Sequence, residues 1–425
     1  MTAAVSIAPS QEGKTNALTF ASSVALALSF VFVAAGITKN DISYVFLAPI
    51  FLLMFPLSKA KYSNPRKAMI VLVFALIFFG TVKGYFIGHN VGYILRFTAP
   101  LLAFWLACLF PGIGRALYQR RDLILLVSFG HTLAVLYVVK TGDFLFAERF
   151  IPGWTLTFSS NAAVSVWHYF ALPFAFVALG KIAAKNLSVS NFFYLGIGAM
   201  TILGLYLLTD TSSYVLAVFV IALLIVLPMT ILNWVRMVSF IVLPVLIVDF
   251  FTSKIISNII VEFMYRLGIE DLGDILRLIQ LDYFVRYSEF LGSGFGAEHT
   301  FPLELQAERQ VSQIVYPYAS ELPIVNIIYN GGILAGIWFF WLSIIVIDLA
   351  RFRKVRKGVC TLGLACSAVL FGSISNPYLF APASMLLLAI MFDVWDESRE
   401  SVKPVNRTRR TQTRLVRQPP PRHLR

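Results

Sequence analysis

The chain has 425 residues, of which 58% are hydrophobic and 13% are charged, and its formal net charge is +13. Its mean hydropathy is +0.77, and its apolar fraction exceeds the roughly 45–50% that is typical of soluble domains. This composition excludes an ordinary water-soluble globular protein. It predicts an all-α polytopic membrane protein whose apolar runs cross the bilayer as helices.

The apolar residues form windows that are close to the roughly 20 residues that a spanning helix needs. Twelve such windows follow one another, at 17–37, 42–57, 68–87, 91–110, 123–139, 162–180, 192–209, 214–229, 237–251, 322–347, 360–374 and 378–393. No signal-peptide pattern precedes the first window, so we expect it to remain in the mature protein.

Lysine and arginine indicate the orientation of these helices, because positively charged loops resist translocation. If the N-terminus is cytoplasmic, the gaps that are then cytoplasmic, together with Lys14 and the C-terminal tail, hold 25 of the 35 basic residues. We therefore expect both termini in the cytoplasm. The basic tail is interpreted as disordered and close to anionic lipid headgroups rather than as a nucleic-acid-binding segment.

The predicted organisation has five parts along the chain. They are a cytoplasmic N-terminus at 1–16, helices 1–9 at 17–251, a large outer loop at 252–321, helices 10–12 at 322–393 and the tail at 394–425. Transporters often consist of two similar halves with a site at the midplane of the membrane. Here the polar residues gather in one late outer loop and no internal repeat is present, which argues against transport.

Two basic residues lie near the outer ends of the third and fourth windows. Lys83 and Arg96 stand on either side of the short turn at His89 and Asn90. A charge in a membrane segment is costly and suggests a function such as binding a substrate diphosphate. The alternative is that these side chains reach the outer headgroups without a further role.

Two polar residues of the middle windows have ordinary explanations beside functional ones. Asp210 stands in an outer turn, where it can cap the turn. His168 on the sixth window is more easily a hydrogen-bonded interior histidine than a catalytic one. Neither is assigned to the site.

The outer loop contains an amphipathic segment at 274–290, which we predict to be a helix lying on the membrane domain. It stops at the glycine turn 292–296, and the stretch 298–320 that follows has no clear period and is interpreted as a lid. Arg277 and Arg286 are nine residues apart, so they project from opposite faces of this helix. Only one of them is therefore expected to be central to a site.

Arginine suits a diphosphate because its planar guanidinium binds phosphate oxygens in pairs. Arg277 has only Asp274 near it, whereas Arg286 has Asp282 and Glu289 as partners for surface ion pairs, so Arg277 is favoured. Both stay candidates for diphosphate binding together with Lys83 and Arg96.

Proton transfer would need a carboxylate or another titratable group nearby. Glu321, where the loop re-enters the bilayer, either faces the reaction site or caps the next helix, and Tyr318 is a further catalytic candidate. His299 has no second ligand at metal spacing. The three cysteines show no ligand or redox spacing, and we expect no metal and no cofactor.

The order of these features resembles that of the O-antigen polymerase and ligase family of bacterial envelopes. The similarity rests on the arginine-bearing helix before Gly292-Ser293-Gly294-Phe295-Gly296, on Glu321, and on the re-entering segment 326–336, NIIYNGGILAG. It implies a C-type membrane glycosyltransferase that uses undecaprenyl-diphosphate-linked sugars at the outer face of the bacterial inner membrane. In that family an arginine before the glycine turn helps hold the diphosphate, and Arg277 matches it best. Arg96 resembles a recurrent arginine on an early helix.

Two departures from the family pattern bear on the branch. The ligase branch places a histidine just before the re-entering helix, and 318–321 (YASE) has none. The family's frequent Ser-Arg after the mid-chain outer turn is also missing, since Ser212-Ser213-Tyr214 stands there. The first departure favours the polymerase branch.

The sequence thus predicts a polysaccharide repeat-unit polymerase that transfers a growing glycan from undecaprenyl diphosphate to the non-reducing end of a lipid-linked repeat unit. Its expected partners are the lipid-linked donor and acceptor, membrane lipids and a chain-length regulator protein, with no nucleic acid. An O-antigen or polymer ligase of the same family is the first alternative. A transporter or flippase for polysaccharide or lipid-linked sugar is the second.

Overall fold

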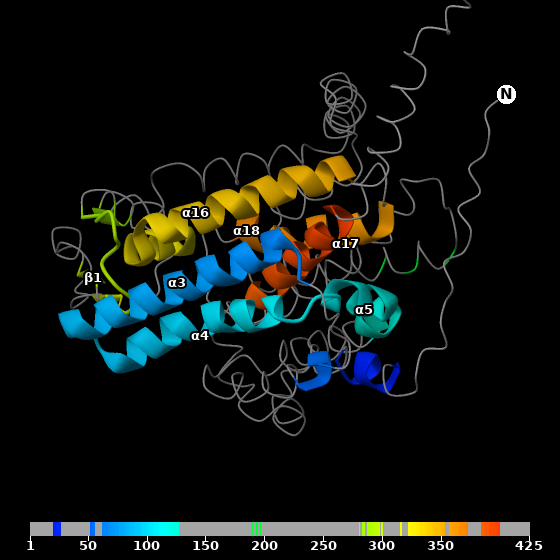
Figure 1. Ribbon diagram of the computed structural model, residues 1–425, viewed down its shortest axis with the longest axis horizontal. Coiled ribbons are helices and arrows are strands. Elements are labelled where there is room, and N and C mark those ends of the chain that lie inside the picture. The colour runs from blue at the N-terminus through cyan, green and yellow to red at the C-terminus, as the bar shows by residue number, and fades with distance from the viewer. Residues whose placement is uncertain are drawn as a thin grey trace, which may run out of the picture.

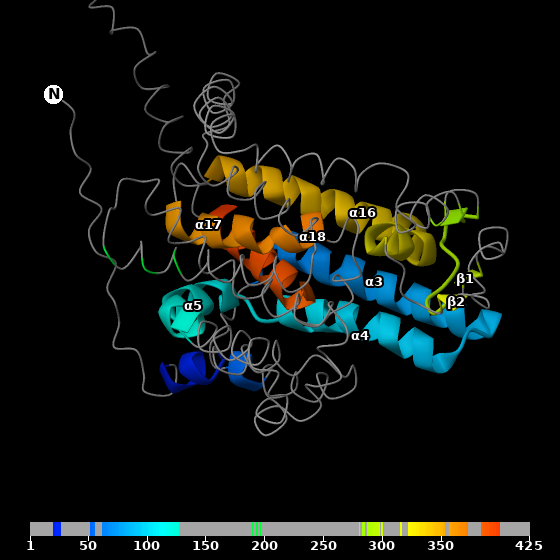
Figure 2. The same cartoon turned by 180° about the vertical axis from the view of Figure 1, so that it is seen from behind.

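The computed structural model describes only part of the chain. The described residues are 20–26, 52–55, 62–126, 189, 193, 196, 280, 283–284, 287–297, 299–300, 315–316, 322–352, 357–372 and 384–399. Regular structure in these ranges is helical except for two short strands (Figures 1 and 2). The predicted spans 162–180, 214–229 and 237–251 lie outside the described residues.

Within the described ranges, three helices are long and apolar enough to cross a membrane: α3 (Asn64–Ile87), α4 (Val91–Cys108) and α16 (Pro323–Phe352). At about 1.5 Å per residue each spans roughly 27 Å or more, against a hydrocarbon layer of about 30 Å. The three correspond to predicted windows 68–87, 91–110 and 322–347. The all-helical, apolar character is thereby confirmed for these windows, and the total of twelve stays a prediction.

Helices α3 and α4 form an antiparallel pair. The Ser63 side chain caps the start of α3 by accepting a hydrogen bond from the Arg66 N–H at 3.1 Å. Gly88 ends the helix in the left-handed region, and Asn90 caps α4 by accepting from the Gly92 N–H at 2.8 Å. Across the pair, the Thr81 and Thr98 hydroxyl oxygens lie 3.1 Å apart.

Helix α16 packs along α3 and is interrupted near its start, a feature that the window 322–347 did not predict. Gly332 has φ 58° and ψ −143°, which are not helical. A Cβ at this position would overlap the backbone of residues 290–292, so the chain can pass only if residue 332 is glycine. The helix then continues to Phe352, beyond the predicted end.

Two short strands lie in the predicted lid. Strand β1 (His299–Thr300) pairs antiparallel with β2 (Val315–Tyr316), with His299 opposite Tyr316. The stretch 298–320 was predicted as a lid because it has no clear period, and these strands were not predicted. This pairing closes it back on itself at the end of the bundle where α3 ends (Figure 1).

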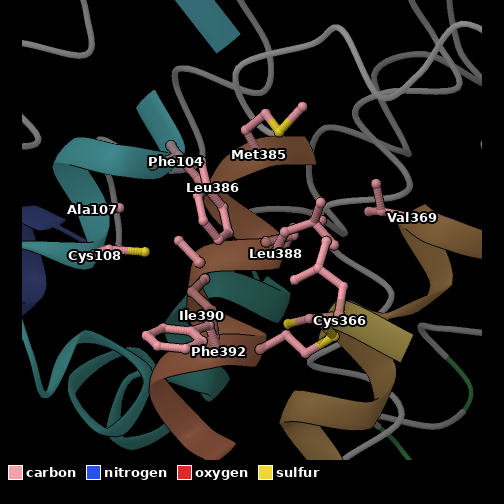
Figure 3. Packing of buried hydrophobic residues seen from close by; sticks show 14 of the residues in the cluster. Phe104, Ala107, Cys108, Cys366, Val369, Met385, Leu386, Leu388, Ile390 and Phe392 are labelled. Carbon is pink, nitrogen blue, oxygen red and sulfur yellow. The ribbon is translucent and has the colours of Figure 1, made fainter. Parts of the chain in front are cut away.

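The last helical segment, 384–399, lies at the centre of the other half of the bundle. Figure 3 shows this segment between residues of α4, among them Phe104, and Cys366, which belongs to α17 (Lys357–Cys366). Residues 384–396 are all buried, as expected for a helix enclosed on every side. Helices α5 (Ile113–Gln119) and α18 (Ala368–Gly372) complete this region.

A buried charge network joins this segment to the start of α3. The Arg66 side chain is 1% exposed; it donates to Asp393 at 2.5 Å, to Asp396 at 2.9 Å and to the Cys108 carbonyl oxygen at 3.1 Å. Asp393 also accepts hydrogen bonds from the backbone N–H groups of Gly112 and Gly114, at 2.9 and 2.7 Å. One guanidinium therefore connects α3, the end of α4 and segment 384–399.

The sequence interpretation of Arg66 was incomplete. It was counted with the positive charges of a cytoplasmic gap, and window 378–393 was ended at Asp393. The helix in fact runs to residue 399, because Asp393 and Asp396 are buried against Arg66 rather than exposed beyond the helix end. A buried ion-pair partner gives no signal of its own in a hydropathy profile.

Replacing Asp393 with Asn is expected to destabilise the protein strongly. Arg66 keeps its ion pair with Asp396, but an asparagine has only one acceptor oxygen for the three buried donors that Asp393 holds, the Arg66 guanidinium and the N–H groups of Gly112 and Gly114. At least one of these donors loses its acceptor, and each buried donor left unsatisfied costs about 1–3 kcal/mol. Thermal unfolding of the purified protein in detergent measures this as a lower midpoint.

The control is Asp348→Asn. The Asp348 carboxylate is partly exposed, and its ion pair with Arg351 is long, at 3.8 Å. It also accepts from the Trp395 indole at 3.2 Å, and asparagine can keep that bond. Equal midpoints for the two variants would contradict a structural role for the network.

Candidate functional site at the Gly88 end

The bundle end at Gly88, opposite the Arg66 network, gathers polar residues from three parts of the chain. The end of α3, the start of α4, the start of α16 and segment 287–297 meet there. We call this the Gly88 end, and we call residues 289–297, which contain the predicted glycine turn, the glycine segment. Strands β1 and β2, which follow the glycine segment in the sequence, lie beside the end of α3 and the start of α16 in both views (Figures 1 and 2).

The glycine segment is inserted between helices instead of lying on the surface. Its N–H groups donate to helix carbonyl oxygens: Ser293 to Tyr329 at 2.9 Å, Gly294 to Asn330 at 3.0 Å and Phe295 to Gly80 at 2.8 Å. In the other direction, the Ile333 N–H donates to Phe290 at 2.9 Å. The kink at Gly332 exposes the α16 backbone groups that make these bonds.

Phe295 anchors the segment. Its side chain is fully buried, and the centroids of its ring and of the Phe97 ring on α4 are 4.6 Å apart. Gly80 and Gly84 form the surface of α3 against which it rests. A Cβ at Gly84 would overlap the Phe295 carbonyl oxygen, and one at Gly80 would overlap its ring. Gly80 and Gly84 therefore leave the space on α3 that Phe295 occupies, and we call this space the Phe295 seat.

Lys83 joins α3 to the same segment by charge. Its ammonium lies 2.5 Å from the Glu289 carboxylate and also donates to the Gly292 carbonyl oxygen. The two side chains are 31% and 61% exposed, so water reaches the pair. Glu289, which its spacing offered to Arg286, thus contacts Lys83, a partner distant in sequence.

Arg96 lies at the same level as Lys83 on the neighbouring helix. Thr81 and Thr98 face each other across the antiparallel pair, and Lys83 and Arg96 are each two residues nearer the turn. The Arg96 side chain is exposed. The structure therefore places two of the predicted diphosphate-binding residues at one height at the Gly88 end.

An aromatic cluster lies where the predicted loop helix ends. Residues 280 and 283–284 are helical, and the Tyr287 N–H donates to the Tyr283 carbonyl oxygen at 3.0 Å, as in a helical turn. The rings of Phe284 and Tyr329 lie 5.0 Å apart, and those of Tyr283 and Tyr287 lie 4.8 Å apart. The helical residues 280, 283 and 284 agree with the predicted helix 274–290, whereas 287–290 are not helical, so the helix ends earlier than predicted. Phe284 packs on Tyr329 of α16.

Buried amides beside this cluster were not singled out by sequence reasoning. The Asn330 side-chain amide donates to the Asn326 carbonyl oxygen at 2.8 Å and also to its side chain. Gln280, fully buried, has neither of its amide atoms in a hydrogen bond. Two asparagines four residues apart in NIIYNGG were the available signal, since such a pair lies on one helix face.

The other predicted site residues lie beyond the part of the chain that the structure describes. Arg277, Arg286, Tyr318 and Glu321 lie outside the described residues, as do Asp210 and His168. The described ranges contain no group of three His, Cys, Asp or Glu side chains that could hold a metal ion. The expected absence of a metal and of a cofactor stays a prediction.

The Lys83 ammonium can exchange the Glu289 carboxylate for another anion. Lys83 is held near the surface by a carboxylate that is itself mostly exposed, and exposed pairs of this kind contribute little stability, about 0–1 kcal/mol. A phosphate oxygen could therefore replace Glu289 at Lys83 without disturbing the packed Phe295 anchor.

No family model and no curated protein sequence matches the chain.

The seat for Phe295 can be tested by changing Gly84 to Ala. The added methyl group must displace the Phe295 backbone, and overpacking of this kind costs about 1–3 kcal/mol. We expect a lower midpoint of thermal unfolding. The matched control is Gly336→Ala on α16, where an added Cβ meets nothing within 4 Å; a midpoint as low as that of Gly84→Ala would contradict the seat.

Tyr283 offers a second test of the packing. Burial, followed by the nearby Tyr329 hydroxyl, raises the pKa of Tyr283 to about 12 from an ordinary value of 10.0. Because the folded pKa is raised, the stability linked to the neutral phenol is present below pH 10 and is lost as pH rises towards 12.

Tyrosine-ring carbon NMR in detergent micelles measures this pKa, with Tyr283→Phe identifying the signal. We expect its midpoint near 12. A midpoint at the value of a free tyrosine, about 10, would show that Tyr283 is not packed against Tyr329 in solution.

Proposed function

We propose that the protein is a polysaccharide repeat-unit polymerase of the O-antigen polymerase type, acting on undecaprenyl-diphosphate-linked sugars. The observation that carries the proposal is the seating of the glycine segment between α3, α4 and α16, beside Lys83. In the sequence, the segment follows the predicted helix 274–290, which includes Arg277. Its anchorage supports a position for that arginine at the Gly88 end, near the level of Lys83 and Arg96.

The chemistry of the proposed transfer needs positive charge. The bond between the sugar C1 and the diphosphate oxygen breaks, and a bond forms between C1 and the acceptor hydroxyl oxygen. The diphosphate leaves with additional negative charge, which fixed cations stabilise more in the transition state than in the ground state. In the proposal Arg277, Lys83 and Arg96 supply these cations, with Arg286 as a further diphosphate contact.

The hydroxyl proton must pass to a base as the new bond forms. Glu321 has this role in the proposal, with Tyr318 as a neighbouring group, because residue 321 directly precedes the stretch 322–330 that packs against the glycine segment. The bilayer orientation assigned from the basic residues puts the Gly88 end on the outer side of the inner membrane. A lipid-linked sugar presented there reaches the site without crossing the bilayer.

Transport is less well supported. A transporter needs paired charges at the middle of the membrane, and the buried pairs of Arg66 are candidates for that role. Arg66 is the third residue of α3, however, so these pairs lie within its first turn, at a helix end. They are also saturated by backbone hydrogen bonds, which supports a structural role.

Replacing Arg277 with Ala should remove long-chain polysaccharide from the cell surface while the protein level stays normal. Losing one preorganised donor to a developing oxyanion typically lowers the rate about 10²–10³-fold. Gel and mass analysis of surface glycans from a strain carrying the variant measures chain length. Arg277→Lys should restore only part of the activity, because lysine lacks the planar bidentate group.

Arg351→Ala is the matched control, since this arginine is 71% exposed at the opposite end of α16. It should leave chain length unchanged. Wild-type chain lengths in Arg277→Ala would contradict the proposal. Full-length polymer accumulating on undecaprenyl diphosphate would instead identify a ligase.

A further inference from the structure

We infer that the glycine segment is a re-entrant element seated at membrane depth, with Phe290 and Leu291 facing lipid. This goes beyond the prediction of a large outer loop whose amphipathic helix lies on the membrane domain and ends at a glycine turn. It depends only on α3, α4 and α16 crossing the bilayer and not on the proposed transfer reaction. Its partner is the bilayer itself, at the boundary between acyl chains and headgroups.

The depth follows from where the segment meets α3. The Phe295 N–H bonds to the Gly80 carbonyl oxygen, and Gly80 is seven residues before the end of α3 at Ile87, or about 10 Å along the axis. Between that level and the helix end, Tyr85, Phe86 and Ile87 are 65%, 82% and 56% exposed. The apolar outer surface of α3 therefore continues beyond the level that Phe295 reaches.

The side chains on the outside of the segment match this surface. Phe290 is 75% exposed and Leu291 is 68% exposed. The Phe290 carbonyl oxygen accepts from Ile333, which begins an exposed apolar series on α16 comprising Ile333, Ile337, Phe340, Ile344 and Ile347. Phe290 and Leu291 thus extend the apolar side of a candidate membrane helix.

About half of the backbone polar groups of the segment have hydrogen-bond partners within the protein. Irregular backbone is tolerated at membrane depth only where protein satisfies its polar groups. Here the N–H groups of residues 292, 293, 294 and 295 and the carbonyl oxygens of 289, 290, 292 and 295 all have partners within the protein.

Charge is balanced at the same place. Glu289 directly precedes Phe290, and a lone carboxylate there would oppose insertion. Lys83 contacts it at 2.5 Å, so the pair carries no net charge. The aliphatic stem of the lysine can lie along the apolar surface while its ammonium stays at headgroup level. The pair marks the interface, and Phe290 and Leu291 enter below it.

The test attaches a nitroxide to Leu291→Cys in the full chain reconstituted into lipid vesicles. The native cysteines, Cys108, Cys360 and Cys366, are all buried, which favours labelling at the new site. The ratio of collision rates with oxygen, which prefers lipid, to those with a water-soluble nickel complex reports depth. We expect a ratio at 291 close to that of Phe86→Cys and clearly above that of Arg399→Cys.

A ratio at 291 equal to that of Arg399→Cys would overturn the inference. Because substitution or labelling could displace the segment, wild-type protein is also reconstituted with a phospholipid that carries a photoreactive acyl chain. Lipid adducts are expected on the peptide containing residues 290–291. A peptide without adducts, alongside labelled residues 85–87, would overturn the inference independently of any variant.

Discussion

The guanidinium of Arg66, shared between Asp393 and Asp396, is the interaction on which the described bundle depends. These partners are 327 and 330 residues away in sequence, so the pairing joins α3, the first of the described candidate membrane helices, to the last described helical segment. Removing charges from water is expensive and is compensated only when each group is fully hydrogen-bonded. The Cys108 carbonyl oxygen and the N–H groups of Gly112 and Gly114 supply those further bonds. The network therefore also fixes the end of α4 and the start of α5.

Helix α3 connects the Arg66 network to the Gly88 end. Arg66 lies in its first turn, while Gly80 and Gly84 in its last two turns form the seat for Phe295. A helix of 24 residues is about 36 Å long, so one rigid element relates the buried charge network to the glycine segment. The kinked start of α16 closes the seat from the other side. The position of the candidate site is thus set by packing at a distance from it.

The two ends treat charge in different ways, and the difference suggests different roles. At the Arg66 end the carboxylates are buried and saturated with hydrogen bonds, which suits permanent assembly. At the Gly88 end Lys83 and Glu289 form one exposed pair, and Arg96 lies exposed at the same level. Such groups can change partners when an anion arrives. The proposed diphosphate site uses the exposed charges of the Gly88 end, and the buried Arg66 network holds the helices that carry them.

The sequence by itself determined the apolar, helical character, the windows of α3, α4 and α16 and the glycine turn, because these depend on local composition and short spacing. It could not identify Glu289 as the partner of Lys83, Arg66 as a buried residue or Gly332 as a kink. Each of these depends on contact between segments more than 30 residues apart, as between Lys83 and Glu289, and hydropathy has no term for such contacts. Only the tertiary structure decided that the glycine turn is inserted among the helices, since backbone hydrogen bonds and the small volume of Gly80 and Gly84 hold it there.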